Sequence, residues 1–185
     1  MTVLNLKFFD YIHNIEKEND VKLYRGLFWP LKHSSSMKKS DYKFKKFLAI
    51  DYGRKFTGLA SFKVDVDPFP LLHGRIAYKD DEQLALDIQE IIDEEFVDYI
   101  VLGIPYFTDG TSSTMTKTVE AFADLLSSKV GIEVFRADET LTTFEAEERM
   151  KSDPRFNFKV DMTQIDAMSA LIILEEFVKN FSDGS

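Results

Sequence analysis

The sequence predicts a three-layer α/β protein in which helices cover both faces of a mixed sheet of five strands. Two observations predict this class. The chain has 185 residues, which suits one domain with a single substantial core. Three segments with strand character come first, and strands then alternate with helical segments. An antiparallel edge joined to parallel strand–helix units forms a sheet of this kind.

The strands are predicted by short apolar runs that lie between turn residues. Residues 47–51 form a buried strand, and residues 56–62 form its hairpin partner across a glycine-containing turn. A third strand follows at about 71–78. The continuous apolar run at 99–103 is typical of a strand that is buried on both faces, and residues 132–137 form the last strand.

The helices are predicted by apolar residues that recur at a spacing of three and four. Residues 81–96 form an amphipathic helix, and a second helix follows the N-cap candidates at 111–113. A third helix follows Thr142. The last helix, from about 163 to 181, is apolar on nearly every side and therefore packs against the sheet. This order of elements is the layout of the ribonuclease H-like fold.

The N-terminal part of the chain lacks this regular pattern. We therefore divide the chain into an N-terminal extension, residues 1–46, and a ribonuclease H-like domain, residues 47–185. The simplest interpretation is a flexible extension whose aromatic residues dock on the domain. Its acidic residues argue against a targeting peptide. Met37 could also be the true start of translation.

Composition limits the chemistry that the protein can perform. The absence of cysteine excludes disulfides, thiolate zinc sites and a cysteine nucleophile, and it suits a reducing cytosol. The three histidines have no ligand spacing, so oxygen atoms must hold any metal, which favours Mg²⁺ or Mn²⁺. No apolar run approaches the ~20 residues that span a bilayer, and no secretory signal is evident. We therefore expect a cytoplasmic protein without a membrane anchor.

The charge of the chain argues mildly against nucleic-acid binding. The net charge is −9, whereas a nucleic-acid binder is normally basic. A local basic stripe can still attract a polyanion. A run of lysines could form such a stripe or could simply solvate a linker; these are Lys38, Lys39, Lys43, Lys45 and Lys46.

Carboxylates at the ends of predicted elements form the candidate site. Asp51 ends the first strand, Glu139 and its neighbour Asp138 follow the last strand, and Asp166 opens the last helix. Ligand sites in open α/β sheets lie beyond the carboxyl ends of strands, and paired divalent ions need several carboxylates from separate elements. Asp51 could alternatively be a turn residue, and Asp166 could cap its helix together with Thr163. Thr142 and Glu145 have the spacing of a further capping box.

Four blocks of sequence resemble the YqgF/RuvX family, which is Holliday junction resolvase-like. The blocks occur in the family's order and cover about residues 46–181. Each block alone is weakly specific, but four in order are highly specific. The blocks are Ile50-Asp51-Tyr52-Gly53-Arg54-Lys55 with Gly58-Leu59-Ala60, Gly103-Ile104-Pro105 with Asp109-Gly110-Thr111, Asp138-Glu139-Thr140-Leu141-Thr142-Thr143 with Glu145-Ala146-Glu147, and residues 165–175.

The resemblance implies a metal-dependent nuclease of the bacterial cytoplasm that trims the 5′ end of pre-16S ribosomal RNA. Its partners would be nucleic acid and ribosomal particles. The family's catalytic and metal-binding acids fall on Asp51, Glu139 and Asp166, with Mg²⁺ or Mn²⁺ as the cofactor. Asp51 would bridge two ions, and the other two acids would each help to bind one of them. The resemblance also implies substrate contacts by Lys55, Asp109, Thr111 and Thr142.

Departures from the family pattern leave other functions open. Phe56 and Thr140 stand where the family usually has basic residues, so charge that could bind phosphate is missing. One alternative is a Holliday-junction-type DNA resolvase, and another is a non-catalytic module that binds nucleic acid or ribosomes on the same fold. A third is a phosphotransferase of the sugar-kinase and actin group. That group needs two such domains around a nucleotide, for which 185 residues are too few.

Overall fold

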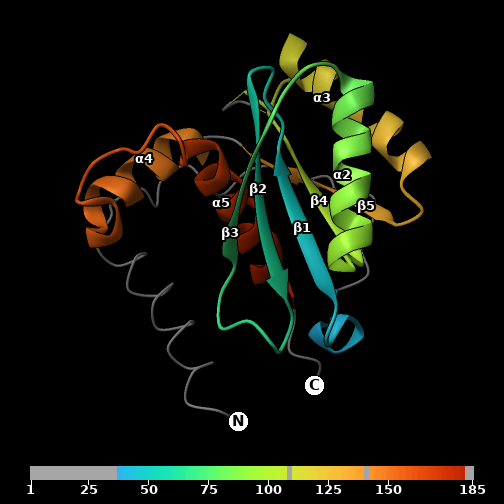
Figure 1. Cartoon of the computed structure of the whole chain (residues 1–185), viewed down its shortest axis with the longest axis horizontal. Coiled ribbons are helices and arrows are strands. Elements are labelled where there is room, and N and C mark those ends of the chain that lie inside the picture. Colours follow the sequence, from blue (N-terminus) through green and yellow to red (C-terminus); the bar gives the residue numbers. More distant parts are fainter. Residues whose placement is uncertain (1–36, 108–109, 140–141, 182–185) are drawn as a thin grey trace.

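The computed structural model describes residues 37–107, 110–139 and 142–181, and it contains a mixed sheet of five strands (Figure 1). The strands are β1 (Lys46–Asp51), β2 (Phe56–Lys63), β3 (Leu71–Ala77), β4 (Tyr99–Ile104) and β5 (Glu133–Asp138). Their order in the sheet is β3-β2-β1-β4-β5. The β1–β2 and β2–β3 pairs are antiparallel, and the β1–β4 and β4–β5 pairs are parallel, as the sequence predicted.

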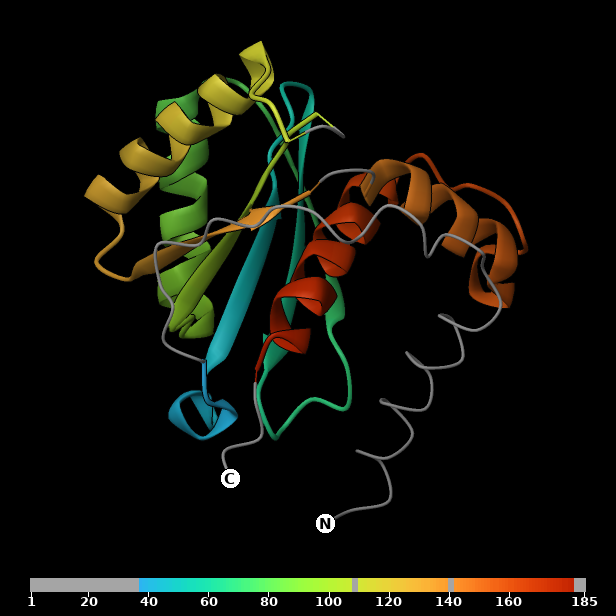
Figure 2. The ribbon, with the colours of Figure 1, turned by 180° about the vertical axis from the view of Figure 1, so that it is seen from behind.

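Helices lie on both faces of this sheet. The α-helices are α2 (Asp81–Glu95), α3 (Thr114–Lys129), α4 (Thr142–Ser152) and α5 (Ile165–Lys179). Helices α2 and α3 cover one face, α5 crosses the other, and α4 extends sideways beyond α5 (Figure 2). This arrangement confirms the predicted three-layer fold. No helix in the described part of the chain combines the length and the apolar character that crossing a membrane requires.

Alternation along β1 decides which side chains face which helices. Leu48 and Ile50 are buried with the side chains of α2 and α3, whereas Phe47 and Ala49 are buried with those of α5. Side chains of a strand point alternately to opposite faces, so Asp51 continues the second row. Its carboxyl group therefore lies on the α5 face of the sheet.

One predicted capping box, Thr163 with Asp166, is wrong. Helix α5 begins at Ile165, and its N-cap residue, Gln164, makes no side-chain cap. The Thr163 hydroxyl donates to Asp161, at 2.6 Å. The helix thus begins one residue later than the spacing of a capping box requires, so Thr163 is not the N-cap residue. At the start of α4 the Thr142 hydroxyl donates to the carbonyl of Glu139, at 3.0 Å, and the capping box of Thr142 with Glu145 stays a prediction.

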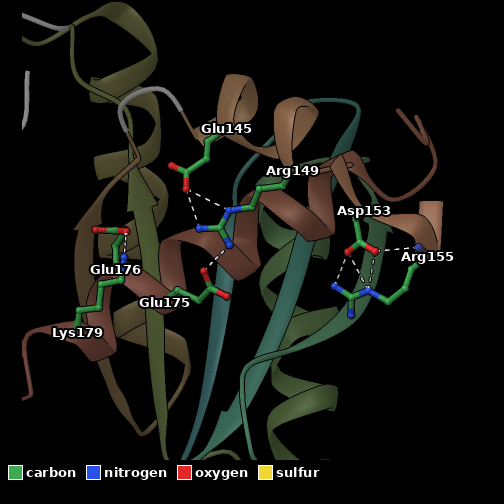
Figure 3. Close-up of polar contacts among 7 residues, drawn as sticks. All are labelled: Glu145, Arg149, Asp153, Arg155, Glu175, Glu176 and Lys179. Carbon is green, nitrogen blue, oxygen red and sulfur yellow. Dashed lines mark hydrogen bonds and ion pairs between the residues drawn. The ribbon is translucent and has the colours of Figure 1, made fainter. Parts of the chain in front are cut away.

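Helix α4 is held on α5 by a partly buried arginine (Figure 3). Arg149 Nη2 donates to Glu145 Oε1 on the same helix, at 2.7 Å, and Arg149 Nη1 donates to Glu175 of α5. Glu175 is only 4% exposed, so loss of Arg149 would leave a buried charge unpaired, which is strongly destabilising. Glu145 thus serves helix packing. The other pairs in Figure 3 lie nearer the surface and join Asp153 to Arg155 and Glu176 to Lys179.

Part of the predicted extension packs on the domain. Tyr42, in a short 3-10 turn at Lys39–Tyr42, stacks on Phe181 with ring centroids 4.9 Å apart and meets the edge of Phe47 at 5.5 Å. These contacts agree with docking of an aromatic residue from this segment. Residues 1–36, which form most of the extension, lie outside the described residues, and the division at 46/47 stays a prediction.

Candidate active site

Three acids that are far apart in the sequence meet at one end of the sheet. Asp51 is the last residue of β1, Glu139 follows β5 directly, and Asp166 lies in the first turn of α5. The main-chain N–H of Glu139 donates to Ile104 O at the end of β4, at 3.2 Å, which keeps it level with the strand ends. Asp51 pairs with Gly58 across the β1–β2 ladder, and the main chain of Asp166 lies directly over Gly58. The structure therefore gathers the predicted acids.

Two glycines make this gathering possible. A Cβ atom on Gly58 would stand 1.9 Å from the Asp166 carbonyl oxygen, so the first turn of α5 touches the sheet only because this residue has no side chain. A Cβ atom on Gly103 would stand 2.5 Å from both Glu139 Oε2 and Ile173 Cδ1. Asp166 and Glu139 can therefore take these positions only because Gly58 on β2 and Gly103 on β4 have no side chain.

We expect Gly58→Ala to destabilise the protein and to impair any activity that needs Asp166. The obstructing atoms belong to the main chain of α5 and cannot rotate away, and overpacking of this kind costs about 2 kcal/mol. The midpoint of thermal unfolding should fall by about 4–8 °C. Gly131→Ala is the matched control, because no heavy atom lies within 4 Å of its added Cβ. Equal unfolding midpoints for the two variants would contradict the close approach of α5.

Burial and mutual repulsion change the acidity of two of the acids. Burial, together with the charge of Asp166, raises the pKa of Asp51 to about 6, although hydrogen bonds from Glu139 and Ser169 act in the opposite direction. Burial, together with the neighbouring charge of Asp51, raises the pKa of Glu139 to about 9. In its protonated form Glu139 donates a hydrogen bond to the Asp51 carboxylate. The two carboxyl groups therefore share one proton near neutral pH and titrate as a pair.

Two buried oxygen atoms at this site have no hydrogen-bond partner among the described residues. They are Glu139 Oε2 and Ser169 Oγ, and the Ser169 hydroxyl lies close enough to Asp51 to lower the pKa of that acid. Unsatisfied buried polar atoms are costly and rare in folded proteins. A carboxylate oxygen without a partner, next to a second carboxylate, fits a positively charged ligand with a preference for oxygen donors, such as Mg²⁺ or Mn²⁺.

The third acid is neutralised in a different way. Asp166 Oδ2 lies 3.3 Å from Arg75 Nη1, on β3. Within the residues that the structure describes, no three acidic or histidine side chains are already arranged to hold one ion. Carboxylates that lie this close together repel one another, and the proton shared by Asp51 and Glu139 and the ion pair of Asp166 with Arg75 both reduce that repulsion.

The predicted substrate-binding residues are more scattered. Lys55 is exposed in the β1–β2 turn, and Thr111 is exposed shortly before α3. Thr142 is buried, and its hydroxyl supports the loop that carries Glu139. Asp109 lies outside the described residues. Substrate contact by these four residues stays a prediction.

The lysines near the start of β1 do not form a free basic stripe. Three of them form ion pairs with acids of the same region, and they lie at the opposite end of β1 from Asp51. A salt bridge neutralises the charge that a polyanion would need. The pairs are Lys39 with Asp65, Lys45 with Asp98, and Lys46 with Glu95.

Sequence reasoning missed two residues of this site. Ser169 follows Asp166 by three positions, which places both on one face of α5, so helical spacing could have indicated it. Arg75 lies opposite Gly58 in the β2–β3 ladder. Only the register of the sheet reveals that position, because β3 carries no motif.

Comparisons with known proteins show which proteins this chain is similar to. "Putative pre-16S rRNA nuclease" of Shewanella oneidensis is 33% identical over 137 residues, which cover 74% of this chain and 95% of the relative. The protein of the same name from Maridesulfovibrio salexigens is 33% identical over 134 residues, which cover 72% and 97%. Among solved structures, RuvC of Thermus thermophilus in complex with a Holliday junction substrate is similar at a TM-score of 0.49 and 11% identity, over 73% of this chain and 95% of that one.

The family assignment follows from the length of the matched region. The sequence model of the RuvX family, which is described as Holliday junction resolvase, matches residues 45–180. This region begins just before β1 and ends just after α5, so it contains the whole sheet and all three acids. The chain therefore belongs to the RuvX family.

Proposed function

We propose that the protein is a metal-dependent nuclease that hydrolyses phosphodiester bonds at the site formed by Asp51, Glu139 and Asp166. The observation that carries the proposal is the buried contact between Asp51 and Glu139, which leaves Glu139 Oε2 without a partner. Two desolvated carboxyl groups in contact weaken the fold, so their presence favours a functional explanation. Membership of the RuvX family supports the same reaction class.

The three acids would hold Mg²⁺ or Mn²⁺ through oxygen atoms only. A bound divalent ion supplies charge neutralisation at the phosphate and lowers the pKa of the attacking water. Asp51 contacts Glu139, and it lies close enough to Asp166 for the charge of Asp166 to raise its pKa. It is therefore the acid best placed to help bind two neighbouring ions. A cation held there would favour the deprotonated form of Glu139, and the shared proton would pass to solvent. Two contacts hold the Glu139 carboxyl group beside Asp51. The Thr142 hydroxyl donates a hydrogen bond to the Glu139 carbonyl oxygen, and Gly103 leaves the space that the Glu139 side chain occupies.

The substrate that we propose is the 5′ end of pre-16S ribosomal RNA, in the cytoplasm, in ribosomal particles or as free precursor. The support is the name of the relatives that match almost along their full length. Branched DNA is the second candidate, because the family model is described as a Holliday junction resolvase.

The test is cleavage by the purified full-length protein. The substrates are a 5′-extended 16S RNA fragment, an unrelated single-stranded RNA and a four-way DNA junction, each with Mg²⁺, Mn²⁺ or chelator. We expect Mg²⁺-dependent cleavage of the 16S precursor and none with chelator. Cleavage of the junction alone would favour the resolvase, and binding without cleavage would favour the non-catalytic module. Absence of both binding and cleavage would contradict the proposal.

A further inference from the structure

A pocket of about 460 Å³ opens beside Asp166, on the side of the site that faces the β2–β3 edge of the sheet. This volume is in the usual range for pockets that take small ligands or single groups of a larger one. Its wall includes the cationic side chains of Arg54, Lys55 and Arg75, the ring of Phe56 and the carboxyl group of Asp166. We call it the Arg75 pocket.

The guanidinium group of Arg75 lies over the ring of Phe56. Arg75 Cζ is 3.7 Å from the centroid of the Phe56 ring. The register explains the contact, because Phe56 pairs with Ala77 and Gly58 pairs with Arg75, which makes Phe56 and Arg75 diagonal neighbours on one face. Arg75 Nη1 is also held by Met162 O, at 3.1 Å, and by the ion pair with Asp166. The planar group is therefore fixed in orientation while it lines the pocket.

The pocket is positively charged, although the chain carries a net charge of −9. Three cationic side chains line it against one carboxylate. Arg54 and Lys55 are exposed, and neither forms an ion pair with another described residue. Lys55 Nζ lies 5.7 Å from the centroid of the Phe56 ring, so the Lys55 charge lies near the ring that Arg75 also contacts. Such a concentration of positive charge attracts a phosphate of a polyanionic strand.

We infer that the Arg75 pocket binds one unpaired nucleotide of the substrate strand next to the cleaved bond. The base stacks on the guanidinium plane of Arg75, which Phe56 supports from behind, and the phosphate lies between Arg54 and Lys55. Nucleobases of unpaired strands stack on aromatic rings and on arginine planes, whereas bases inside a duplex are not accessible to such a pocket. The inference rests on the proposed nuclease function for its location, and it adds the requirement that the strand is unpaired there.

The test measures binding without cleavage, by fluorescence anisotropy in chelator, with a labelled single-stranded RNA of twelve nucleotides and its duplex as probes. Arg75→Lys keeps the charge but removes the plane. We expect it to weaken single-strand binding about tenfold, with an unchanged salt dependence and little effect on the duplex. Arg136→Lys is the matched control, because Arg136 lies on the opposite edge strand, β5, and should leave affinity unchanged.

Two further variants separate stacking from charge and from folding. Lys55→Ala should reduce the slope of log affinity against log salt by about 0.7, the value for one phosphate contact on a single strand. Phe56→Leu keeps the Arg75–Asp166 ion pair but removes the supporting ring, so it should weaken single-strand binding even if Arg75→Lys disturbs folding.

Unchanged single-strand affinity in both Arg75→Lys and Phe56→Leu would overturn the inference. If the wild type cleaves RNA in Mg²⁺ but both variants keep its single-strand affinity, only the proposed role of the pocket is contradicted. If binding depends on Arg75 but the wild type never cleaves, only the proposed nuclease function is contradicted. The measurements therefore distinguish failure of the nucleotide-binding pocket from failure of the nuclease function.

Discussion

Asp51→Asn is expected to lower the Mg²⁺-dependent cleavage rate by about 1,000-fold or more. The substitution preserves size but removes the negative charge from the acid that lies between Glu139 and Asp166. Metal ions contribute several kcal/mol to stabilising the transition state of phosphoryl hydrolysis, and about 4 kcal/mol corresponds to about three powers of ten in rate. Single-turnover cleavage of the precursor RNA, with enzyme in excess, measures this loss without interference from product release.

The control for this prediction is an acid of the same type that lies away from the site. Asp93→Asn changes an exposed residue of α2, on the opposite face of the sheet, and should leave the cleavage rate unchanged. Thermal unfolding of both variants shows whether either has lost its fold. If folded Asp51→Asn protein retains full Mg²⁺-dependent cleavage, the assignment of the metal-binding acids is wrong.

Glu139→Gln is expected to stabilise the metal-free protein at pH 7 to 8 while it abolishes cleavage. Burial raises the pKa of Glu139 to about 9, so the folded protein must hold a proton that the unfolded chain releases. Glutamine donates to Asp51 permanently and requires no such uptake. We expect a gain of about 2 kcal/mol in the free energy of unfolding. For a chain of this size that corresponds to an increase of about 4–8 °C in the unfolding midpoint.

The same shift sets the sign of a pH dependence. The folded-state pKa of Glu139, about 9, lies above its ordinary value of 4.5, so the native state binds more protons than the unfolded state between these values. The stability that depends on this group is complete below about pH 4.5 and is lost as the pH rises towards 9. The unfolding midpoint of the metal-free wild type should therefore fall across this window more steeply than that of Glu139→Gln.

Calorimetry between pH 5 and pH 9, with chelator and with Mg²⁺, tests this prediction. Mg²⁺ should raise the midpoint of the wild type, and more at high pH, because cations bind carboxylates that have lost their protons. The Glu139→Gln variant should respond little to Mg²⁺. A variant that is no more stable than the wild type at any pH in chelator would show that the buried carboxyl pair does not weaken the fold.

The elements of the domain could be predicted from the sequence because their signals are local. Short apolar runs marked β1 and β4, and helical spacing marked α2 and α3, with boundaries that differ by only a few residues from those observed. The acids of the site were also identifiable, because each stands at the end of such an element. The capping box at Thr163 failed because helix α5 begins one residue later than the pattern requires, and the start of a helix depends on the packed domain.

The sequence by itself determined the order of the elements, the fold class and the three acids, since these follow from local periodicity, strand ends and motif order. Only the tertiary structure decided how the acids are neutralised. The ladder places Asp51, Gly58 and Arg75 in one row across three strands, and α5 descends on that row because Gly58 leaves space. Contacts between residues so far apart depend on register and on the depth of helix packing, which no local pattern specifies.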